Sequence, residues 1–503
     1  MTQQATQHAT QHQTNRYDAL VVGGGVGGLV SAIRLAAAGR SVALFERNAQ
    51  FGGKLAVRER DGFVFDTGPS LLTLPSLLDE VFQLAGTSLT AEVDLVRLDP
   101  SFRYFWPDAS TVTFRDQPVA TAEALDAFSP GSGAEYLDYL RRARTIWQTS
   151  ERTFFAGDMG SPFSLLRRLR SPRDFARIDA GRTLASRGEK SFSDARLHQW
   201  LGRYATYSGS DPSLAPATLG CIAAVEADFG AWYVRGGLGA LRDALVRVAQ
   251  RCGVEMYADS EVLAIVATNR RVAGVRVAQS GEAEQEFLAN TIVCNADAEH
   301  LYRDLLPHAR RLKEVQHIER STSGIAVMVG VEGRTPLVAH HNVWFSRDYG
   351  REFRDIAEGR IPRHPTIYGC ISSVTDPTQA PAECENWFLL INTPADERAA
   401  TEEVGTWLLD ELATMGPDLR ARARFVEVIG PRDIAQRYRS PGGAIYGTSS
   451  NGRSAAFRRP AIRGPLRGLY LVGGSTHPGG GLPLVTISAR IAADLILRNR
   501  AQR

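Results

Sequence analysis

The sequence lacks the features that mark disulfide-bonded, membrane-spanning and nucleic-acid-binding proteins. Its cysteines are few, odd in number and without a C-x-x-C pair: Cys221, Cys252, Cys294, Cys370 and Cys384. We expect them to be reduced core residues of a cytoplasmic protein, not disulfides or metal ligands. No apolar run approaches the roughly 20 residues that span a bilayer, so any membrane contact must come from the surface. A formal net charge of +3 gives no support for nucleic-acid binding.

The length and composition predict a globular protein with more than one core. A chain of 503 residues exceeds what one hydrophobic core usually supports, and its apolar content of 44% is ordinary. Residues 1–16 are rich in Thr, Gln, Ala and His, and we expect them to form a disordered tail.

A glycine-rich turn follows the first predicted strand, at residues 19–22. Gly23, Gly25 and Gly28 have the G-x-G-x-x-G spacing, with Gly27 between them. In this pattern the first glycine allows a tight turn, the second admits a pyrophosphate, and the third lets helix and strand pack closely. The sequence therefore predicts a dinucleotide site at the start of the next helix, although such a turn can also be only a turn.

An acidic residue ends the second predicted strand, residues 41–45. Glu46 is suited to bind the two hydroxyls of an adenosine ribose, and it would repel a 2′-phosphate. This pattern favours FAD or NAD over NADP.

Two more glycine-bearing turns follow, FGGK at 51–54 and DTGPS at 66–70. They offer backbone N–H groups, and Lys54 is a candidate contact for a phosphate or a ring. Each turn could also be purely structural.

A second glycine-rich turn joins strand to helix near the end of the chain, at 473–483. Pro483 suits the first helical position, and the helix N-terminus suits the N1/C2=O region of a flavin, which carries negative charge in the reduced state. His477 is a candidate proton acceptor there, but a histidine that orders the loop is the favoured interpretation. The whole turn could also be a surface loop.

The region between these turns divides into three parts. Residues 93–208 contain many aromatic and arginine side chains and are typical of an inserted domain, and 301–440 mix strands and a helix. Residues 161–190 carry eight basic and three acidic side chains among apolar ones, which fits either a membrane-surface segment or a solvated face. Residues 254–294 predict four strands, at 254–257, 261–267, 271–278 and 287–294, with the Val262 backbone near an adenine.

Taken together, these motifs resemble the bacterial carotenoid desaturases of the phytoene-desaturase family. The resemblance covers nearly the whole chain and rests on GGGVGG with Glu46, FGGK, DTGPS, RYATYSG at 203–209, GAWYVRGG at 230–237 and LYLVGGSTHPGGGLP at 469–483. It implies an α/β fold, with a Rossmann-like FAD-binding domain of the amine-oxidase type and an inserted α+β substrate domain. The FAD domain would comprise 17–92, 209–300 and 441–500, and the membrane-facing substrate domain 93–208 and 301–440.

The resemblance also implies site residues, carried over position by position. The cofactor-binding set is Gly23, Gly25, Gly27, Gly28, Glu46, Gly53, Lys54, Gly68, Pro69, Ser70, Val262, Gly474, Ser475, Gly481, Leu482, Pro483 and Leu484. Within it the first glycines would contact the pyrophosphate, Glu46 the ribose, Lys54 the phosphate or flavin side, and the Val262 backbone the adenine. Residues 68–70, Gly474, Ser475 and 481–484 would approach the flavin.

The implied function is FAD-dependent desaturation of a long apolar polyene, by hydride transfer from an allylic carbon to flavin. The sequence has one dinucleotide fingerprint and no second one for a nicotinamide, so reoxidation would use quinone or oxygen. RYATYSG and GGSTHPGGG resemble the branch that performs 3,4-desaturation of 1-hydroxycarotenoids. Such an enzyme would be cytoplasmic and peripherally membrane-associated. The alternatives are a phytoene desaturase, a carotenoid oxygenase or isomerase, a flavin amine oxidase and a non-catalytic prenyl-binding escort protein.

Overall fold

The computed structural model describes residues 15–159, 167–169, 171–279, 283–399, 401 and 403–501. Most of the expected tail lies outside these ranges. Its last two residues are ordered, since the Asn15 carbonyl accepts a hydrogen bond from Leu288 N at 2.7 Å and Arg16 forms a β-bridge with Leu288. Residues 15 and 16 therefore pair with Leu288, contrary to the prediction that they belong to a disordered tail.

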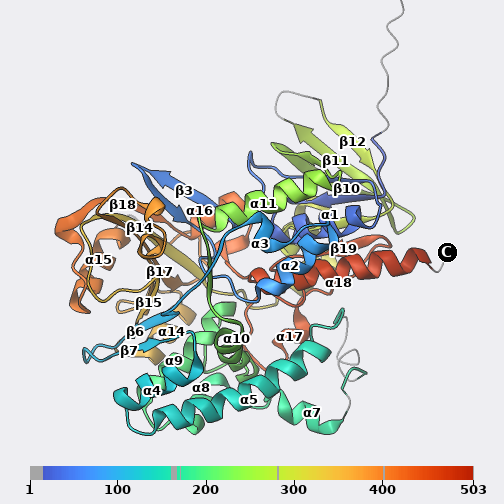
Figure 1. The fold of residues 1–503 in the computed structure, drawn as a ribbon. Helices are drawn as coiled ribbons and strands as arrows, with labels where there is room; N and C mark the ends of the chain where they lie inside the picture. Colours follow the sequence, from blue (N-terminus) through green and yellow to red (C-terminus); the bar gives the residue numbers. More distant parts are fainter. Residues whose placement is uncertain are drawn as a thin grey trace, which may run out of the picture.

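A five-stranded parallel sheet holds the first glycine-rich turn. Its strands come from four distant parts of the chain, in the order β19 (Leu469–Leu471), β13 (Ile292–Cys294), β1 (Ala19–Val22), β2 (Val42–Phe45) and β9 (Glu255–Tyr257). Parallel strands need both faces covered, so their residues form short, continuous apolar runs. This sheet, drawn beside α18 in Figure 1, confirms the predicted α/β class.

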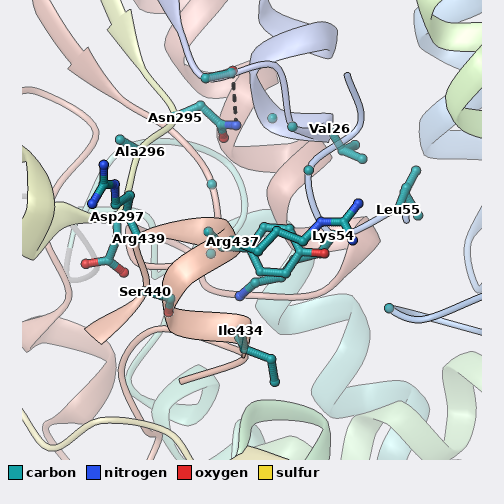
Figure 2. A pocket seen from close by; sticks show the side chains of 18 of the residues that line it. Val26, Lys54, Leu55, Asn295, Ala296, Asp297, Ile434, Arg437, Arg439 and Ser440 are labelled. Atoms are coloured by element: carbon teal, nitrogen blue, oxygen red, sulfur yellow. Dashed lines mark hydrogen bonds between the residues drawn. The ribbon is translucent and has the colours of Figure 1, made fainter. Parts of the chain in front are cut away.

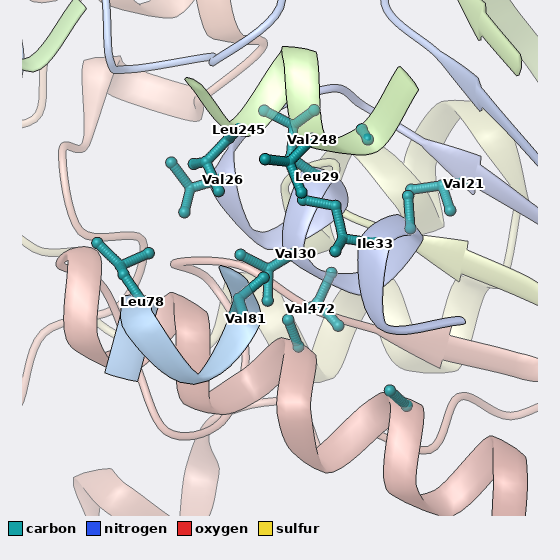
Figure 3. Close-up of a cluster of buried hydrophobic side chains, with 14 of the residues drawn as sticks. Val21, Val26, Leu29, Val30, Ile33, Leu78, Val81, Leu245, Val248 and Val472 are labelled. Carbon is teal, nitrogen blue, oxygen red and sulfur yellow. The ribbon is translucent and has the colours of Figure 1, made fainter. Parts of the chain in front are cut away.

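Side chains of β1 alternate between two cores because successive residues of a strand point to opposite faces. Ala19 and Val21 face a helical layer, whereas Leu20 and Val22 face an antiparallel sheet. The helical layer contains α1 (Val26–Ala37), α2 (Pro75–Leu84), α11 (Leu238–Arg251) and α18 (Leu482–Ala501). Figure 3 shows α1 enclosed by the other three, with its side chains interleaved among theirs.

The antiparallel sheet on the other face consists of β10 (Ser260–Thr268), β11 (Arg271–Gln279) and β12 (Gln285–Leu288). Two of the predicted strands are corrected here. Val262 lies in this separate sheet and not beside β1, because the chain turns at Asp259, which has a φ of 48°. The strand expected at 287–294 is two strands, β12 and β13, in different sheets.

A seven-stranded mixed sheet forms the second half of the molecule (left in Figure 1). Its order is β18 (Ala423–Ile429), β14 (Ser323–Glu332), β17 (Cys384–Thr393), β16 (Ile367–Cys370), β15 (His341–Trp344), β6 (Phe102–Phe105) and β7 (Thr111–Phe114). Helix α15 (Val404–Thr414) covers one face. The sheet thus combines strands from 93–208 with strands from 301–440.

A layer of helices packs beside β6 and β7 around a core rich in aromatic rings. It contains α4 (Pro118–Phe128), α5 (Ser132–Thr153), α8 (Leu184–Ser191), α9 (Ala195–Gly202) and α10 (Ile222–Phe229). Since α10 packs on α5, residues predicted for the FAD domain share this core. The proposed domain boundaries stay a prediction.

Shorter elements connect these layers. They are β3 (Val57–Arg60) with β4 (Phe63–Asp66), β5 (Leu95–Arg97) with β8 (Trp232–Val234), α3 (Leu89–Glu92), α7 (Pro172–Arg177), α12 (Ala298–His300), α13 (Ala309–Gln316), α14 (Tyr349–Ala357), α16 (Pro431–Tyr438) and α17 (Ala455–Arg458).

The basic segment 161–190 is only partly described, since 161–166 and 170 lie outside the described residues. Several of its arginines bind protein groups instead of facing solvent. The Arg168 guanidinium donates to three carbonyl oxygens, those of Thr153, Gly157 and Asp158. Arg187 is buried and pairs with Asp179 at 2.6 Å. Arg167, Arg173 and Lys190 are exposed.

Candidate active site

A cavity of about 340 Å³ lies where the two glycine-rich turns meet. Most of the predicted cofactor-binding residues line it: Gly23, Gly25, Gly27, Glu46, Gly53, Lys54, Gly68, Pro69, Val262, Gly474, Ser475, Gly481 and Leu482. These residues are spread over 460 positions of sequence, and the fold brings them to one place. Figure 2 shows part of this lining.

The first turn presents backbone to the cavity at the N-terminus of α1. Gly23 has a φ of 93°, a left-handed conformation that favours glycine. Gly25 is the N-cap residue of α1, so the first N–H groups of the helix are left for a ligand or solvent. A helix N-terminus with exposed N–H groups favours an anion such as a pyrophosphate.

Glu46 closes the cavity at the end of β2. Its side chain is buried, and one carboxylate oxygen accepts a hydrogen bond from Gly24 N at 2.9 Å. The other oxygen accepts from Asn48 N at 2.9 Å and from Asn48 Nδ2 at 2.6 Å. These contacts fix the carboxylate beside the glycine-rich turn, the place expected of a ribose-binding group.

Lys54 lies deeper, where its ammonium group is buried among backbone oxygens. Its Nζ donates to the Ile445 carbonyl oxygen at 2.7 Å and lies 5.9 Å from the centre of the Tyr438 ring. Burial lowers the pKa of Lys54 to about 8, while the nearby Asp297 carboxylate acts in the opposite direction. Burial likewise raises the pKa of Asp297. The site therefore holds a cation that an anionic ligand would stabilise.

The second turn reaches the cavity through Gly481 and Leu482, where α18 begins. Gly481 has a φ of 98°, and a Cβ there would meet no atom within 4 Å, so its backbone borders open space. Two helix N-termini, those of α1 and α18, thus meet at one cavity.

Four predicted residues do not line the cavity. Gly28 serves packing, because a Cβ there would lie 2.1 Å from the Gly23 carbonyl oxygen. The Ser70 hydroxyl is hydrogen-bonded to the Tyr368 hydroxyl at 2.7 Å. Pro483 is the second residue of α18 and not its first, and Leu484 packs into the helical core.

His477 also lies away from the cavity, which corrects its expected place beside the cofactor. Its ring packs on Phe154, with centroids 4.7 Å apart, and Nε2 donates to the Phe154 carbonyl oxygen at 3.1 Å. Burial lowers the pKa of His477 to about 3, so the imidazole is neutral. This position fits the alternative of a histidine that orders the loop.

Several lining residues were not assigned from the sequence. The Asn295 side chain donates to the Gly23 carbonyl oxygen at 3.3 Å, the dashed line in Figure 2. Helix α16 adds Ile434, Arg437 and Tyr438. The Asn-Ala-Asp sequence at 295–297 directly after a strand was a usable signal for the first. The residues of α16 carry no such sequence signal, because their contact with the cavity depends on packing between segments that are distant in the sequence.

One wall of the cavity is apolar and comes from the seven-stranded sheet. Ala326 on β14 and Phe388 and Leu390 on β17 line it, with Ile429 at the end of β18. Ala326 and Leu390 are paired across the two strands. One continuous cavity therefore joins the dinucleotide groups to an apolar surface.

The comparison with protein families agrees with this geometry. The sequence profile of flavin containing amine oxidoreductases matches residues 26–497, from the first turn to α18. The chain belongs to this family. It is an FAD-dependent oxidoreductase, which confirms the cofactor and enzyme class predicted from the sequence.

Individual members of the family are similar over nearly their full lengths. The chain is 33% identical to a 4,4'-diapolycopene oxygenase of Methylomonas sp., over 95% of this chain and 97% of that protein. It is 32% identical to a 1-hydroxycarotenoid 3,4-desaturase of Flavobacterium sp., over 96% and 99% of the two chains. The predicted resemblance to carotenoid desaturases is thereby confirmed.

Solved structures share the fold at low sequence identity. A putrescine oxidase variant superposes with a TM-score of 0.64 at 15% identity, covering 97% of this chain and 99% of its own. Cyclohexylamine oxidase of Brevibacterium oxydans gives 0.59 at 15% identity, covering 97% and 100%. The family fold is thus the amine-oxidase fold that the sequence predicted.

The residues present fit FAD. The open backbone at Gly25 and Gly481, the fixed carboxylate of Glu46 and the buried ammonium of Lys54 match the phosphates and ribose of a dinucleotide. Their assignment as FAD contacts is a proposal, which replacement of Glu46 and of Lys54 tests.

Proposed function

We propose that this protein is a carotenoid desaturase, with 3,4-desaturation of a 1-hydroxycarotenoid as its reaction. The observation that carries the proposal is the apolar wall of Ala326, Phe388 and Leu390 in the cavity that also contains Glu46. The relatives named for carotenoid substrates support the substrate class, and the RYATYSG and GGSTHPGGG motifs support the branch.

The chemistry divides between cofactor and protein. FAD, when bound, would supply an acceptor for a hydride from an allylic C–H bond, while the proton of the adjacent carbon would leave to a weak base or to water as the new double bond forms. The protein orients the polyene along the apolar wall and excludes water there. The described side chains of that wall include no acid or base; they are Ala326, Phe388, Leu390 and Ile429. The wall therefore contributes by positioning the substrate and by excluding water.

The substrate is a membrane lipid, and we propose that the enzyme collects it at the membrane surface. The described part of the chain contains no helix with both the length and the apolar character needed to cross a bilayer. Arg167, Arg173 and Lys190 are exposed on the predicted basic segment and are suited to anionic headgroups. Quinone or oxygen would reoxidise the reduced enzyme.

Oxygenation of an acyclic polyene is a second candidate, because the oxygenase relatives are as similar to this chain as the desaturase. Product mass separates the two reactions. A desaturated product is lighter by two hydrogens for each new double bond, whereas an oxygenated product gains oxygen.

The test uses the flavin-loaded enzyme with acyclic carotenoids in liposomes, without NAD(P)H. We expect a shift of absorption to longer wavelength, a mass lower by two hydrogens, and faster conversion of a 1-hydroxycarotenoid than of phytoene. Conversion of phytoene alone would reject the branch, and a gain of oxygen would favour the oxygenase. A folded, flavin-loaded protein that leaves every polyene unchanged would contradict the proposal.

A further inference from the structure

A cluster of two histidines and a cysteine lies in the seven-stranded sheet, outside the cavity lining. His341 is the first residue of β15, His340 directly precedes it, and Cys370 ends the neighbouring β16. One ligand atom from each of the three lies within 4.8 Å of the other two, and all three side chains are buried. His341 and Cys370 are register partners of the antiparallel pair, so their side chains project from the same face.

Each imidazole is held through one nitrogen only. The His340 Nδ1 is hydrogen-bonded to the Thr375 hydroxyl at 2.8 Å, and the His341 Nδ1 to the Tyr368 hydroxyl at 2.8 Å. Within the described structure, neither Nε2 has a hydrogen-bond partner, and both are buried. A buried nitrogen without a hydrogen-bond partner lowers the stability of the folded state. Two such atoms in one cluster therefore indicate a position where a ligand would bind.

The hydroxyl partners match the outer shell of a metal site. If each Nδ1–H donates to its hydroxyl, each Nε2 keeps a lone pair for a metal. The Tyr368 hydroxyl continues the chain to the Ser70 hydroxyl at 2.7 Å, which fixes the orientation of the His341 ring.

We propose that His340, His341 and Cys370 form a closed binding site for a single Cu⁺ ion. Two imidazoles and a thiolate are soft or borderline ligands, and this set selects copper or zinc over Mg²⁺ or Ca²⁺. Binding releases the Cys370 thiol proton to solvent and forms a Cu–S bond, with no change of oxidation state.

The charges around the cluster favour a monovalent ion. Cu⁺ with one thiolate is neutral, whereas Zn²⁺ with one thiolate leaves a buried positive charge. The Arg203 guanidinium lies 4.5 Å from the centre of the Phe102 ring, and Phe102 stacks on His341, so this nearby cation would repel that charge. The nearby carboxylates are engaged elsewhere: Asp376 accepts from Gly236 N at 2.8 Å and from Thr378, and Asp66 accepts from Leu238 N at 2.9 Å.

The test measures Cu⁺ binding by the flavin-loaded protein. Reduced protein is titrated anaerobically with Cu⁺ against a chromophoric Cu⁺ chelator. We expect one equivalent of Cu⁺ to be withheld by the wild type, and at least tenfold weaker retention after Cys370→Ser. Cys384→Ser is the matched control, because Cys384 is also buried in the same sheet. It should bind as the wild type does.

Two further measurements distinguish a loss of Cu⁺ binding from misfolding of a variant. His340→Gln and His341→Gln should each weaken the retention of Cu⁺, and their flavin content and circular dichroism show whether they are folded. X-ray absorption of the Cu⁺-loaded wild type should show a Cu⁺ edge with one sulfur ligand. Failure to withhold Cu⁺, equal retention by Cys370→Ser and Cys384→Ser, or preferential retention of Zn²⁺ would overturn the proposal. Since the assay needs no polyene, a failed desaturase assay leaves its result unaffected.

Discussion

The Asn295 side-chain amide donates a hydrogen bond to the Gly23 carbonyl oxygen at 3.3 Å, and this contact joins β13 to the first glycine-rich turn. The same amide packs against the backbone of the turn, since a Cβ at Gly27 would lie 2.6 Å from Asn295 Oδ1. Asn295, which lies 272 positions from Gly23 in the sequence, thus holds the G-x-G-x-x-G turn in its conformation.

The first prediction concerns the third glycine of the pattern. Gly28→Ala would place a Cβ 2.1 Å from the Gly23 carbonyl oxygen, a backbone atom that cannot move without distorting the turn. We expect a loss of about 1–3 kcal/mol in the free energy of unfolding, measured by urea denaturation, together with reduced flavin content. Gly181→Ala is the control, because a Cβ there meets nothing within 4 Å. Equal stability of the two variants would contradict the packing argument.

The second prediction tests Glu46 as a cofactor ligand. Glu46→Arg removes the acceptors of Gly24 N and Asn48 N and places a cation where the ribose hydroxyls need an anion. We expect FAD binding to weaken by about 100-fold or more, measured by fluorescence titration of the apoprotein. Glu59→Arg on the exposed strand β3 should bind FAD normally. If Glu46→Arg purifies with one FAD per chain, Glu46 is not part of the site.

The third prediction follows from the lowered pKa of Lys54. Below pH 8 the lysine is protonated in both the free and the bound protein, so FAD affinity should be constant. Above pH 8 the free protein loses this proton, and binding an anionic pyrophosphate must restore it, so affinity should fall as the pH rises. Lys54→Met should bind more weakly and lose this pH dependence, whereas the exposed Lys313→Met should retain it. A flat wild-type profile between pH 7 and 10 would exclude Lys54 as an anion contact.

The fourth prediction concerns stability. Glu352 on α14 is buried, one of its oxygens accepts from Thr366 N and from the Thr366 hydroxyl, and burial raises its pKa to about 7 from 4.5. Because the folded state holds this proton more tightly than the unfolded state, stability should fall as the pH rises from 4.5 through 7, by up to about 3 kcal/mol.

Glu352→Gln removes the buried charge and keeps an acceptor for Thr366. It should unfold at a higher temperature than the wild type at pH 8 and should match it near pH 4.5. Glu358→Gln, at an exposed position just after α14, is the control and should leave the pH profile unchanged. An identical profile for wild type and Glu352→Gln would mean that this carboxyl titrates normally.

The fifth prediction tests membrane contact with residues chosen from the structure. Arg168 is bound to three carbonyl oxygens, so its replacement would disturb the fold as well as the charge. Arg167→Glu, Arg173→Glu and Lys190→Glu together should reduce sedimentation with anionic liposomes, as should added salt. The exposed set Arg310→Glu, Lys313→Glu and Arg363→Glu controls for net charge. Equal sedimentation of both variants would locate lipid binding elsewhere.

Local patterns were sufficient for the parts of the protein that depend on neighbouring residues. The G-x-G-x-x-G turn, Glu46 at the end of β2, and the strand, glycines and helix at 469–501 each need only a short segment with the right periodicity. For this reason the sequence by itself determined the α/β class, the family and FAD as the cofactor. In the structure, thirteen of the seventeen predicted cofactor residues line one cavity, and their role as FAD contacts stays a prediction.

Only the tertiary structure decided which distant segments meet. Val262 reaches the cavity from a separate antiparallel sheet, α16 adds Arg437 and Tyr438, and His477 turns away toward Phe154. The pairing of His341 with Cys370 depends on the register of β15 and β16, which no local pattern specifies. The physical reason is that these contacts come from strand order and long-range packing, whose free energy is shared over the whole core and is not encoded in any one segment.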